Sequence, residues 1–359
     1  MTHADSVTDL RRRGARGSAD AHGRLGWPIM TETEISGARP LRLPRLRRIG
    51  RGAAVASAAL AVAVTAASFC YNLATDGQTA RPAGLLMVRA GGFDTRYLTW
   101  GTSGSPIVLI PGAFETADTF AAVGAALGAD HRVFAIDLSG TGYSTPSPPF
   151  NAAHLADQLL AFVKAMGLTG ANAPVLVGHS SGAAVVGMAA LHDSERGTDA
   201  VAGVVFLDGD ATPLGAPSFI GWLLIDPYRT SILRLALSSS SVIRSVYASQ
   251  CGPTCAPLTA AGVEAWRQPL RQPGFEQAIT YTMRYGIPSM TGAELAQLRA
   301  TAVPKRVIYG ANDPQMSATV AAQTAERIGA PTPVAVPGRH LTMISSPGQL
   351  AAAIRLIEG

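Results

Sequence analysis

Cysteine is scarce in this chain, with three in 359 residues. Three cysteines do not make a disulfide scaffold. Cys251 and Cys255 are close enough in sequence to pair in an oxidising compartment, and two unrelated buried thiols are the alternative. A zinc site would need two more ligands, and no nearby histidine or cysteine supplies them. We therefore expect no metal, and Cys70 lacks a lipid-attachment context because the large Phe69 precedes it.

Charged residues are also few, at 15% of the chain, whereas apolar residues make up 47%. Such a composition can bury a large core and excludes a chain that is disordered overall. The length suits one large domain with an insertion better than two full enzymes. No internal repeat is detectable.

The main part of the chain lacks a basic surplus. Eleven arginines and five acidic residues precede residue 52, leaving 18 basic and 19 acidic residues in the remainder. A protein that binds nucleic acid should carry its positive charge on the folded domain. The sequence therefore predicts no nucleic-acid partner, although the net charge of the chain is +5.

The longest uncharged run lies between Arg51 and Asp76. Residues 52–74 can span a bilayer at about 1.5 Å per residue. The basic stretch RLPRLRRIGR precedes this run, and such an asymmetry holds the N-terminus inside. We therefore predict a disordered segment over residues 1–51, a transmembrane signal anchor over residues 52–74, and an extracytoplasmic main domain.

Other interpretations of this leader remain open. Cleavage after Ala67 would remove it as a signal peptide and secrete the same domain. Met30 could be the true start, because the basic flank and the apolar run both follow it. A buried alanine-rich core helix is disfavoured beside so many arginines.

From residue 84 onward, short apolar runs alternate with helical stretches. Runs of this kind are typical of strands buried on both faces of a mainly parallel sheet. Asn151 can cap the helix that follows it, and Ser346-Pro347 can open the last helix. The alternation predicts an α/β fold. It is interrupted between Leu207 and Val307, so we expect an inserted, largely helical cap at about residues 212–300.

The main chemical signal is the motif GHSSG. An apolar strand leads into Gly178, Ser180 and Gly182, and a helix of small residues follows. A nucleophilic serine needs a sharp turn at the edge of the sheet, and the flanking glycines permit it. The motif predicts a nucleophile elbow with Ser180 as the attacking residue.

A serine hydroxyl needs a base, and the base needs an orienting acid. His340 lies in a loop beyond the last predicted strand, whereas His192 falls at the far end of a helix. Asp313 follows the preceding strand in GANDP. We therefore predict a triad of Ser180, Asp313 and His340, with Asp208 and Asp210 as reserve acids.

Two glycine-rich loops complete the predicted site. In IPGAF the turn at Gly112 can expose the N–H of Ala113, which together with the N–H of Ser181 would form an oxyanion hole. In DLSGTGYS we interpret Asp137 as a loop-capping residue. No GxGxxG occurs there, so a dinucleotide is not expected, and the sequence predicts no cofactor.

The motifs IPGAF, DLSGTGYS, GHSSG, GANDP and GRH, in that order, resemble the α/β-hydrolase superfamily over roughly residues 84–359. The resemblance implies an eight-stranded, mostly parallel sheet with a helical cap between strands 6 and 7. It also implies the catalytic order Ser, Asp, His. Many members have His-Gly in the oxyanion loop, where this chain has Pro111-Gly112. Members with an aspartate nucleophile are disfavoured, because Ser180 occupies that position.

The leading functional prediction is a hydrolase that cleaves small-molecule carboxylic esters through an acyl-enzyme. Another serine chemistry on the same fold is the first alternative: peptidase, lactonase, C–C hydrolase or acyltransferase. A non-catalytic binding protein on a hydrolase scaffold is the second. The acyl group, the alcohol group and the oligomeric state are left open.

Overall fold

The computed structural model describes residues 44–76, 81–213 and 225–357. It divides into two compact units, Met1–Ala59 and Leu60–Gly359. The disorder expected over residues 1–43 lies outside the described residues. Over residues 44–51 that expectation is wrong, because helix α1 (Pro44–Thr75) already begins at Pro44. Arginine and leucine favour helix, and proline is tolerated in the first turn.

Helix α1 contains an apolar segment, Gly50–Thr75, of 26 residues with a mean hydropathy of 2.0. By length and composition it can cross a membrane, and a signal sequence would share both properties. Its most hydrophobic window is not buried in the protein, and large side chains such as Leu60 and Val62 are exposed. The segment is compatible with a membrane anchor or a signal.

The main domain is built on an eight-stranded sheet with the order β1-β2-β4-β3-β5-β6-β7-β8. β1 and β2 form an antiparallel pair, β2 is antiparallel to β4, and the remaining neighbours are parallel. The strands are β1 (Leu86–Ala90), β2 (Phe93–Trp100), β3 (Pro106–Ile110), β4 (Arg132–Ile136), β5 (Val175–His179), β6 (Gly203–Leu207), β7 (Lys305–Gly310) and β8 (Val334–Val336).

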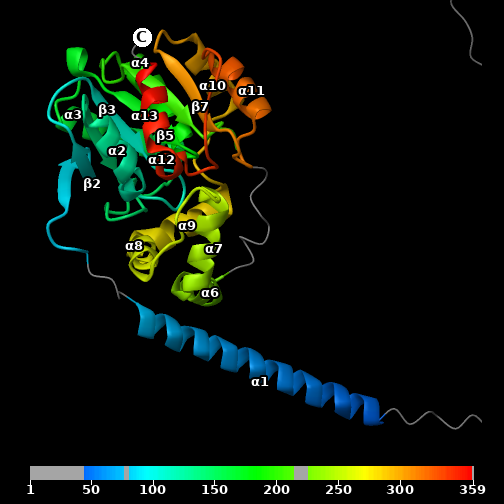
Figure 1. Cartoon of the computed structure of the whole chain (residues 1–359). Helices are drawn as coiled ribbons and strands as arrows, with labels where there is room; N and C mark the ends of the chain where they lie inside the picture. Colours follow the sequence, from blue (N-terminus) through cyan, green and yellow to red (C-terminus); the bar gives the residue numbers. More distant parts are fainter. Residues whose placement is uncertain (1–43, 77–80, 214–224, 358–359) are drawn as a thin grey trace, which may run out of the picture. The chain divides into compact units, whose positions relative to one another are not determined.

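Helices cover both faces of this sheet (Figure 1). Every residue of β3, β5 and β6 is buried, as expected for strands enclosed on two sides. The helices of the main domain outside the cap are η1 (Ala117–Phe120), α2 (Ala121–Leu127), α3 (Ala152–Ala165), η2 (Gly170–Asn172), α4 (Gly182–Arg196), α10 (Gly292–Ala300), α11 (Ala318–Ile328), α12 (Thr342–Ser345) and α13 (Pro347–Arg355).

Alternate residues of each central strand enter two separate cores. Val108 and Ile110 of β3 pack with α3 and α4 in one cluster, whereas Ile107 and Leu109 pack with α2 and α13 in the other. This is the period of two expected of a strand. The α/β-hydrolase architecture predicted from the sequence is confirmed.

The cap between β6 and β7 is helical, as predicted. It consists of α6 (Tyr228–Ser238), α7 (Ser240–Cys251), α8 (Ala260–Leu270) and α9 (Pro273–Tyr285) (Figure 1). Helix α10 falls inside the residues expected to form the cap, but it packs on α4 and α11 of the main domain. Cys251 and Cys255 form a disulfide with Cα atoms 5.8 Å apart, which closes the turn after α7.

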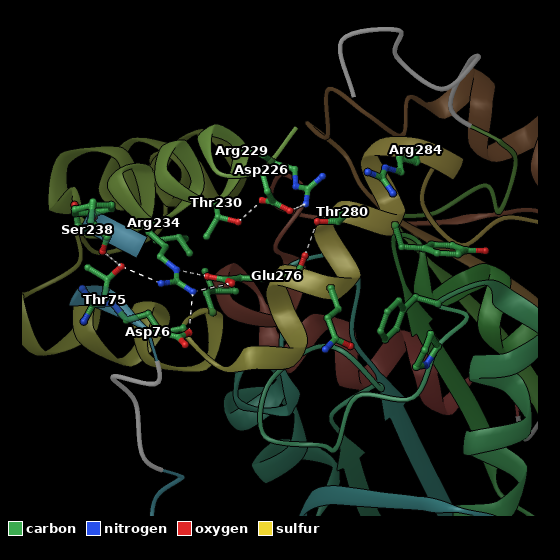
Figure 2. A pocket seen from close by; sticks show the side chains of 18 of the residues that line it. Thr75, Asp76, Asp226, Arg229, Thr230, Arg234, Ser238, Glu276, Thr280 and Arg284 are labelled. Atoms are coloured by element: carbon green, nitrogen blue, oxygen red, sulfur yellow. Dashed lines mark hydrogen bonds and ion pairs between the residues drawn. The ribbon is translucent and has the colours of Figure 1, made fainter. Parts of the chain in front are cut away.

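Within the second unit, the last turn of α1 is joined to the cap by Arg234 (Figure 2). The guanidinium donates to the carbonyl of Asn72 at 2.7 Å and to the hydroxyl of Thr75 at 3.0 Å. It also pairs with the carboxylates of Asp76 and Glu276. A cation at a helix C-terminus satisfies carbonyls that lack intrahelical partners. One side chain of α6 therefore holds α1 and α9 together.

Candidate active site

Ser180 occupies the sharp turn between β5 and α4. Its φ of 51° lies in the left-handed region, which a residue other than glycine adopts rarely. The turn is fixed by its own N–H, which donates to the carbonyl of Leu207 at 2.8 Å. A strained backbone held at a strand end is the geometry of a nucleophile elbow.

The glycines flanking Ser180 are required by close backbone approach. A Cβ at Gly178 would lie 2.2 Å from the carbonyl oxygen of Gly182, and one at Gly182 would lie 2.7 Å from that of Pro111. Both distances are far below any normal contact, so no other residue fits at either position without moving the backbone. The helix can therefore start directly beside the nucleophile.

His340 and Asp313 meet at the carboxyl ends of β7 and β8. Nδ1 of His340 lies 2.8 Å from Oδ2 of Asp313, and both residues are buried. Burial raises the pKa of Asp313, but the hydrogen bond and the charge of His340 outweigh it and lower the pKa below its usual value. Ser180 and His340 line one small cavity of about 70 Å³. The structure thus brings all three predicted triad residues to the same edge of the sheet.

The two reserve carboxylates line the same cavity as Ser180 and His340, but their hydrogen-bond partners differ from that of Asp313. Asp208 accepts the N–H of Gly310 at 2.6 Å and the hydroxyl of Thr342 at 2.7 Å. Its burial raises the pKa to about 8, although the neighbouring His179 opposes this. Asp210 accepts the N–H of Thr212. Asp208 therefore joins the end of β7 to the start of α12.

The predicted oxyanion donors lie on either side of the nucleophile. A Cβ at Gly112 would stand 2.9 Å from Cβ of Ser180, so the oxyanion loop runs against the elbow. In the part of the chain that the structure describes, no acceptor takes the N–H of Ala113 or of Ser181. Ser181 precedes the first residue of α4 without a side-chain capping hydrogen bond, at the helix end where the dipole favours negative charge. Two such N–H groups can stabilise an oxyanion.

A buried ion pair beneath the site was not foreseen from the sequence. His179 Nδ1 lies 2.8 Å from Oε2 of Glu115, and its Nε2 lies 2.8 Å from the backbone carbonyl of His340. Despite burial, the charge and hydrogen bond of Glu115 raise the pKa of His179 to about 9. Both ring nitrogens then carry protons and donate. The carboxylate of Glu115 also accepts the N–H of Gly112 at 3.1 Å. The pair therefore joins the loop that contains Gly112 to the loop that contains His340.

Glu115 and His179 gave only a faint signal in sequence. Each sits beside a motif residue, three positions after Gly112 and one before Ser180, but they are 64 residues apart. The spacing of Glu115 and His179 in the sequence does not predict that their side chains are in contact. A buried position for two ionisable residues would have been the clue, and burial is decided by the fold.

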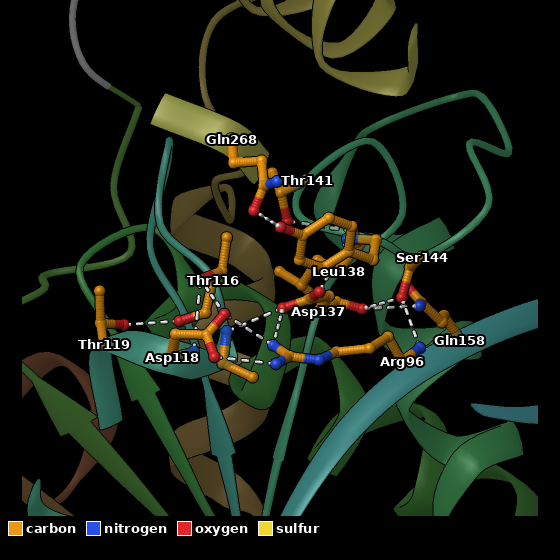
Figure 3. Close-up of polar contacts among 12 residues, drawn as sticks. Arg96, Thr116, Asp118, Thr119, Asp137, Leu138, Thr141, Ser144, Gln158 and Gln268 are labelled. Carbon is orange, nitrogen blue, oxygen red and sulfur yellow. Dashed lines mark hydrogen bonds and ion pairs between the residues drawn. The ribbon is translucent and has the colours of Figure 1, made fainter. Parts of the chain in front are cut away.

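Asp137 has the loop-capping geometry expected of it (Figure 3). Its carboxylate accepts the N–H groups of Ala117 and Tyr143, each at 2.8 Å, and faces the guanidinium of Arg96 at 3.3 Å. Burial raises its pKa to about 6, against the pull of Arg96. His192 pairs with Asp157 near the surface. Neither Asp137 nor His192 is part of the candidate site.

Helix α9 separates the site from a larger cleft. One face of α9 and the oxyanion loop enclose a cavity of about 40 Å³ next to Ser181. The opposite face lines a cleft of about 700 Å³. The residues of α9 on the inner side are Phe275, Ala278, Ile279 and Thr282. The cavities beside the nucleophile are therefore small, and α9 is their wall.

Comparison with known proteins identifies the family. The profile of the alpha/beta hydrolase family matches residues 107–353, which is more than half of the chain. The chain belongs to this family, and a hydrolase is the class of protein that fold and match define.

Particular relatives are more distant. N-formylmaleamate deformylase of Pseudomonas putida is 29% identical over 140 residues, which cover 38% of this chain and 50% of that protein. The chain thus spans about half the length of this curated relative. A serine hydrolase involved in carbazole degradation superposes with a TM-score of 0.61 at 21% identity, covering 76% of this chain and 98% of that one.

A membrane phospholipase A, described as a bacterial virulence factor, superposes with a TM-score of 0.59 at 17% identity. The match covers 87% of this chain and 97% of that chain. At such low identities the two structural likenesses show the fold alone.

Proposed function

We propose that this protein is a serine hydrolase that cleaves carboxylic esters through an acyl-enzyme. The observation that carries the proposal is that three parts meet at one edge of the sheet. Ser180 lies on a strained turn and shares a small cavity with His340, which is paired with the buried Asp313. The N–H groups of Ala113 and Ser181, which have no acceptor among the described residues, lie in a second cavity next to Ser181. A binding protein has no need of all three.

In the acylation step, Oγ of Ser180 attacks the ester carbonyl and His340 takes the proton. The charge that forms on the imidazole is stabilised by Asp313, and the charge on the carbonyl oxygen by the two N–H groups. His340 then gives its proton to the leaving alcohol. The acyl group remains on Ser180.

In the deacylation step, His340 removes a proton from water, which attacks the acyl carbonyl. The same N–H groups stabilise the second tetrahedral intermediate, and the acid leaves as Ser180 regains its proton. No metal or cofactor takes part in this proposal. The proposed substrate is a small molecule, because the cavities next to Ser180 and Ser181 have volumes of about 70 and 40 Å³.

The test is a chain-length panel of aryl esters with the full-length protein and with Ser180→Ala. We expect the variant to lose at least about 10³-fold in kcat while its melting temperature stays close to that of the wild type. A fluorophosphonate should label the wild-type protein and leave the variant unlabelled. Turnover of the variant near the wild-type rate would refute the assignment of Ser180.

Hydrolysis of a small amide is the second candidate. The observation that favours it is the similarity to N-formylmaleamate deformylase over half of that protein. The same triad can cleave C–N bonds, because His340 can protonate an amine leaving group. Adding formyl and acetyl amides to the ester panel separates the two, since a deformylase should prefer the formyl amide.

We further propose that α1 anchors the protein in a membrane with the hydrolase domain outside the cytoplasm. The apolar segment Gly50–Thr75 is long enough to cross a bilayer, and the arginines that precede it favour an inside N-terminus. Cleavage as a signal peptide would place the same domain outside without an anchor. Fractionation of cells followed by N-terminal sequencing of the purified protein distinguishes these outcomes.

A further inference from the structure

Helix α6 presents its polar and apolar side chains in the reverse of the usual arrangement. Four of the five α6 residues that line the large cleft are polar; the five are Arg229, Thr230, Arg234, Leu237 and Ser238 (Figure 2). Ile232 and Leu235, by contrast, are 54% and 53% exposed. A helix on a water-soluble surface turns its apolar stripe toward the core. The exposed face of α6 therefore points to an apolar neighbour outside the protein.

Helix α6 and the proline before it contact the second half of α1 through side-chain hydrogen bonds. The hydroxyls of Thr65 and Tyr228 are 2.5 Å apart, and Nδ2 of Asn72 donates to the carbonyl of Pro227 at 2.9 Å. Ser231, which is buried, donates to Oδ1 of Asn72 at 2.8 Å. With the Arg234 contacts described above, these bonds tie α6 to α1 from Thr65 to Asp76.

The depth of these contacts follows from helix geometry. Ten residues separate Thr65 from Thr75, or about 15 Å along the axis. An apolar segment of 26 residues has a length of about 39 Å, which exceeds a hydrocarbon layer of about 30 Å by a few ångströms at each end. If α1 spans a bilayer, Thr65 lies within the hydrocarbon layer and the hydroxyl of Tyr228 reaches that depth. Asn72, which bonds the carbonyl of Pro227 just before α6, lies close to the boundary of the layer.

Resting on the proposed membrane anchor, we propose that the lipid bilayer is the partner of this face. Helix α6 sits beside α1 in the leaflet nearest the hydrolase domain, with Ile232 and Leu235 against the acyl chains. Its charged groups are compatible with this placement, because Arg229 pairs with Asp226 at the cleft and Arg234 reaches Asp76 at the end of the span.

The composition around α6 also fits a membrane surface. Residues 228–251, which form α6 and α7, contain three arginines and no acidic residue. Cationic helices with one apolar face are typical of segments that lie at lipid interfaces, where anionic headgroups attract them. A leaflet explains both the exposed apolar side chains and the missing acids.

The experiment uses the full-length protein in lipid vesicles. All variants carry Cys70→Ser, so that a single introduced cysteine can receive an environment-sensitive fluorophore. Ile232→Cys and Leu235→Cys test the proposed face. Val62→Cys on α1 is the lipid-facing control, and Glu195→Cys, at the exposed end of α4, is the water-facing control. Each sample is treated with brominated lipids and, separately, with aqueous iodide.

We expect labels at Ile232 and Leu235 to be quenched by brominated lipids at least half as strongly as the label at Val62. Iodide should quench the label at Glu195 several-fold more strongly than either. Strong iodide quenching at Ile232 with lipid quenching intact at Val62 would overturn the inference and leave the anchor standing. Protection from both quenchers would also overturn it, since a second protein copy would then cover α6.

The outcome is separable from the other proposals. Loss of lipid quenching at Val62 itself would show that α1 does not span the bilayer, and the placement of α6 would fall with it. Fluorophosphonate labelling of the same vesicles reports on Ser180 independently. A labelled enzyme with a water-exposed α6 would therefore be a hydrolase whose cap does not enter the membrane.

Discussion

Asp208 and Asp313 follow neighbouring strands and are both buried, yet their surroundings differ. Asp313 faces the imidazole of His340, whereas Asp208 accepts hydrogen bonds from Gly310 and Thr342. Opposite shifts accompany this difference: the pKa of Asp313 is lowered and that of Asp208 is raised to about 8. At the scale of single residues, both carboxylates follow a strand, and it is the hydrogen-bond partner of each that decides which one can orient a histidine base.

Asp313→Asn and Asp208→Asn test this assignment. We expect Asp313→Asn to lower kcat by about 10⁴-fold, because an amide favours the wrong tautomer of the histidine. Asp208→Asn keeps an oxygen acceptor for Gly310 and should lower kcat by less than about tenfold. The measurement is steady-state hydrolysis of an aryl ester. A crippled Asp208→Asn beside a mild Asp313→Asn would mean that the wrong carboxylate was chosen.

The Glu115–His179 pair should make stability depend on pH. The pKa of His179 is raised from its ordinary 6.5 to about 9, since Glu115 outweighs the cost of burial. A raised pKa means that the folded state binds the proton more tightly. The stabilisation is therefore fully present below pH 6.5 and is lost as the pH rises through about 9. We expect the melting temperature to fall over that range.

Glu115→Gln should remove this effect. It leaves His179 buried without its counter-charge, which costs about 3–5 kcal/mol of unfolding free energy. The slope of melting temperature against pH between 6.5 and 9 should flatten, because the cause of the raised pKa is gone. Asp157→Asn, which removes the partner of His192 near the surface, is the matched control and should change neither quantity measurably. An unchanged slope in Glu115→Gln would contradict the ion pair.

At the scale of elements, the two faces of helix α9 line different cavities. Its inner face closes the cavity beside Ser181, and its outer face lines the large cleft. Phe275 on the inner face packs edge-on against Phe114 of the oxyanion loop, with ring centroids 5.8 Å apart. The cap therefore bounds the cavity in which the proposed acyl group would lie, while the sheet positions the candidate triad.

Ile279→Ala should lengthen the preferred acyl chain. Removing this inner side chain opens space beside the oxyanion loop, and one or two methylenes in such a pocket change kcat/KM by about tenfold. The ratio of kcat/KM for a longer to a shorter aryl ester is the measurement. Gln277→Ala on the outer face is the control. Equal shifts in both variants would show that α9 is not the wall of the acyl site.

At the scale of the whole molecule, basic charge and enzyme are separated along the chain. The arginines are concentrated before the apolar run, and the remainder is close to neutral. This distribution suits a protein that crosses a membrane once and keeps its folded domain on the far side. It has no role in the chemistry of the site.

Protease treatment of intact cells tests this topology. Once any outer barrier is opened, we expect external protease to digest the hydrolase domain, because the proposed topology places it outside the cytoplasmic membrane. A cytoplasmic marker enzyme should survive as the control. A protected domain in the soluble cytosol would refute the topology, whereas a soluble external form beginning near Ser68 would refute only the anchor.

Much of this molecule was predictable from local signals. Short apolar runs become buried parallel strands, because helices cover both faces and leave no place for polar alternation. The motif GHSSG implied a tight turn, because only glycine tolerates a backbone as close as that at Gly178 and Gly182. The order of strands and motifs was enough to predict the α/β-hydrolase fold, which the structure confirms.

The features that the sequence did not predict depended on contacts between residues far apart in the chain. The start of α1 at Pro44 and the packing of α10 on α4 rather than in the cap were not foreseen, because helix ends and packing partners leave weak traces in sequence. The disulfide between Cys251 and Cys255 was one of two open readings, and the geometry of the turn selected it.

The sequence by itself determined the class of fold, the elbow serine and the apolar leader, since each is written in consecutive residues whose local physics is nearly independent of the rest. Only the tertiary structure decided that Glu115 meets His179 across 64 positions, that Asp208 serves loops while Asp313 faces His340, and that α6 exposes its apolar side. Burial and pairing are properties of neighbours in space, and neighbours in space are set by the packing of the whole sheet and its helices.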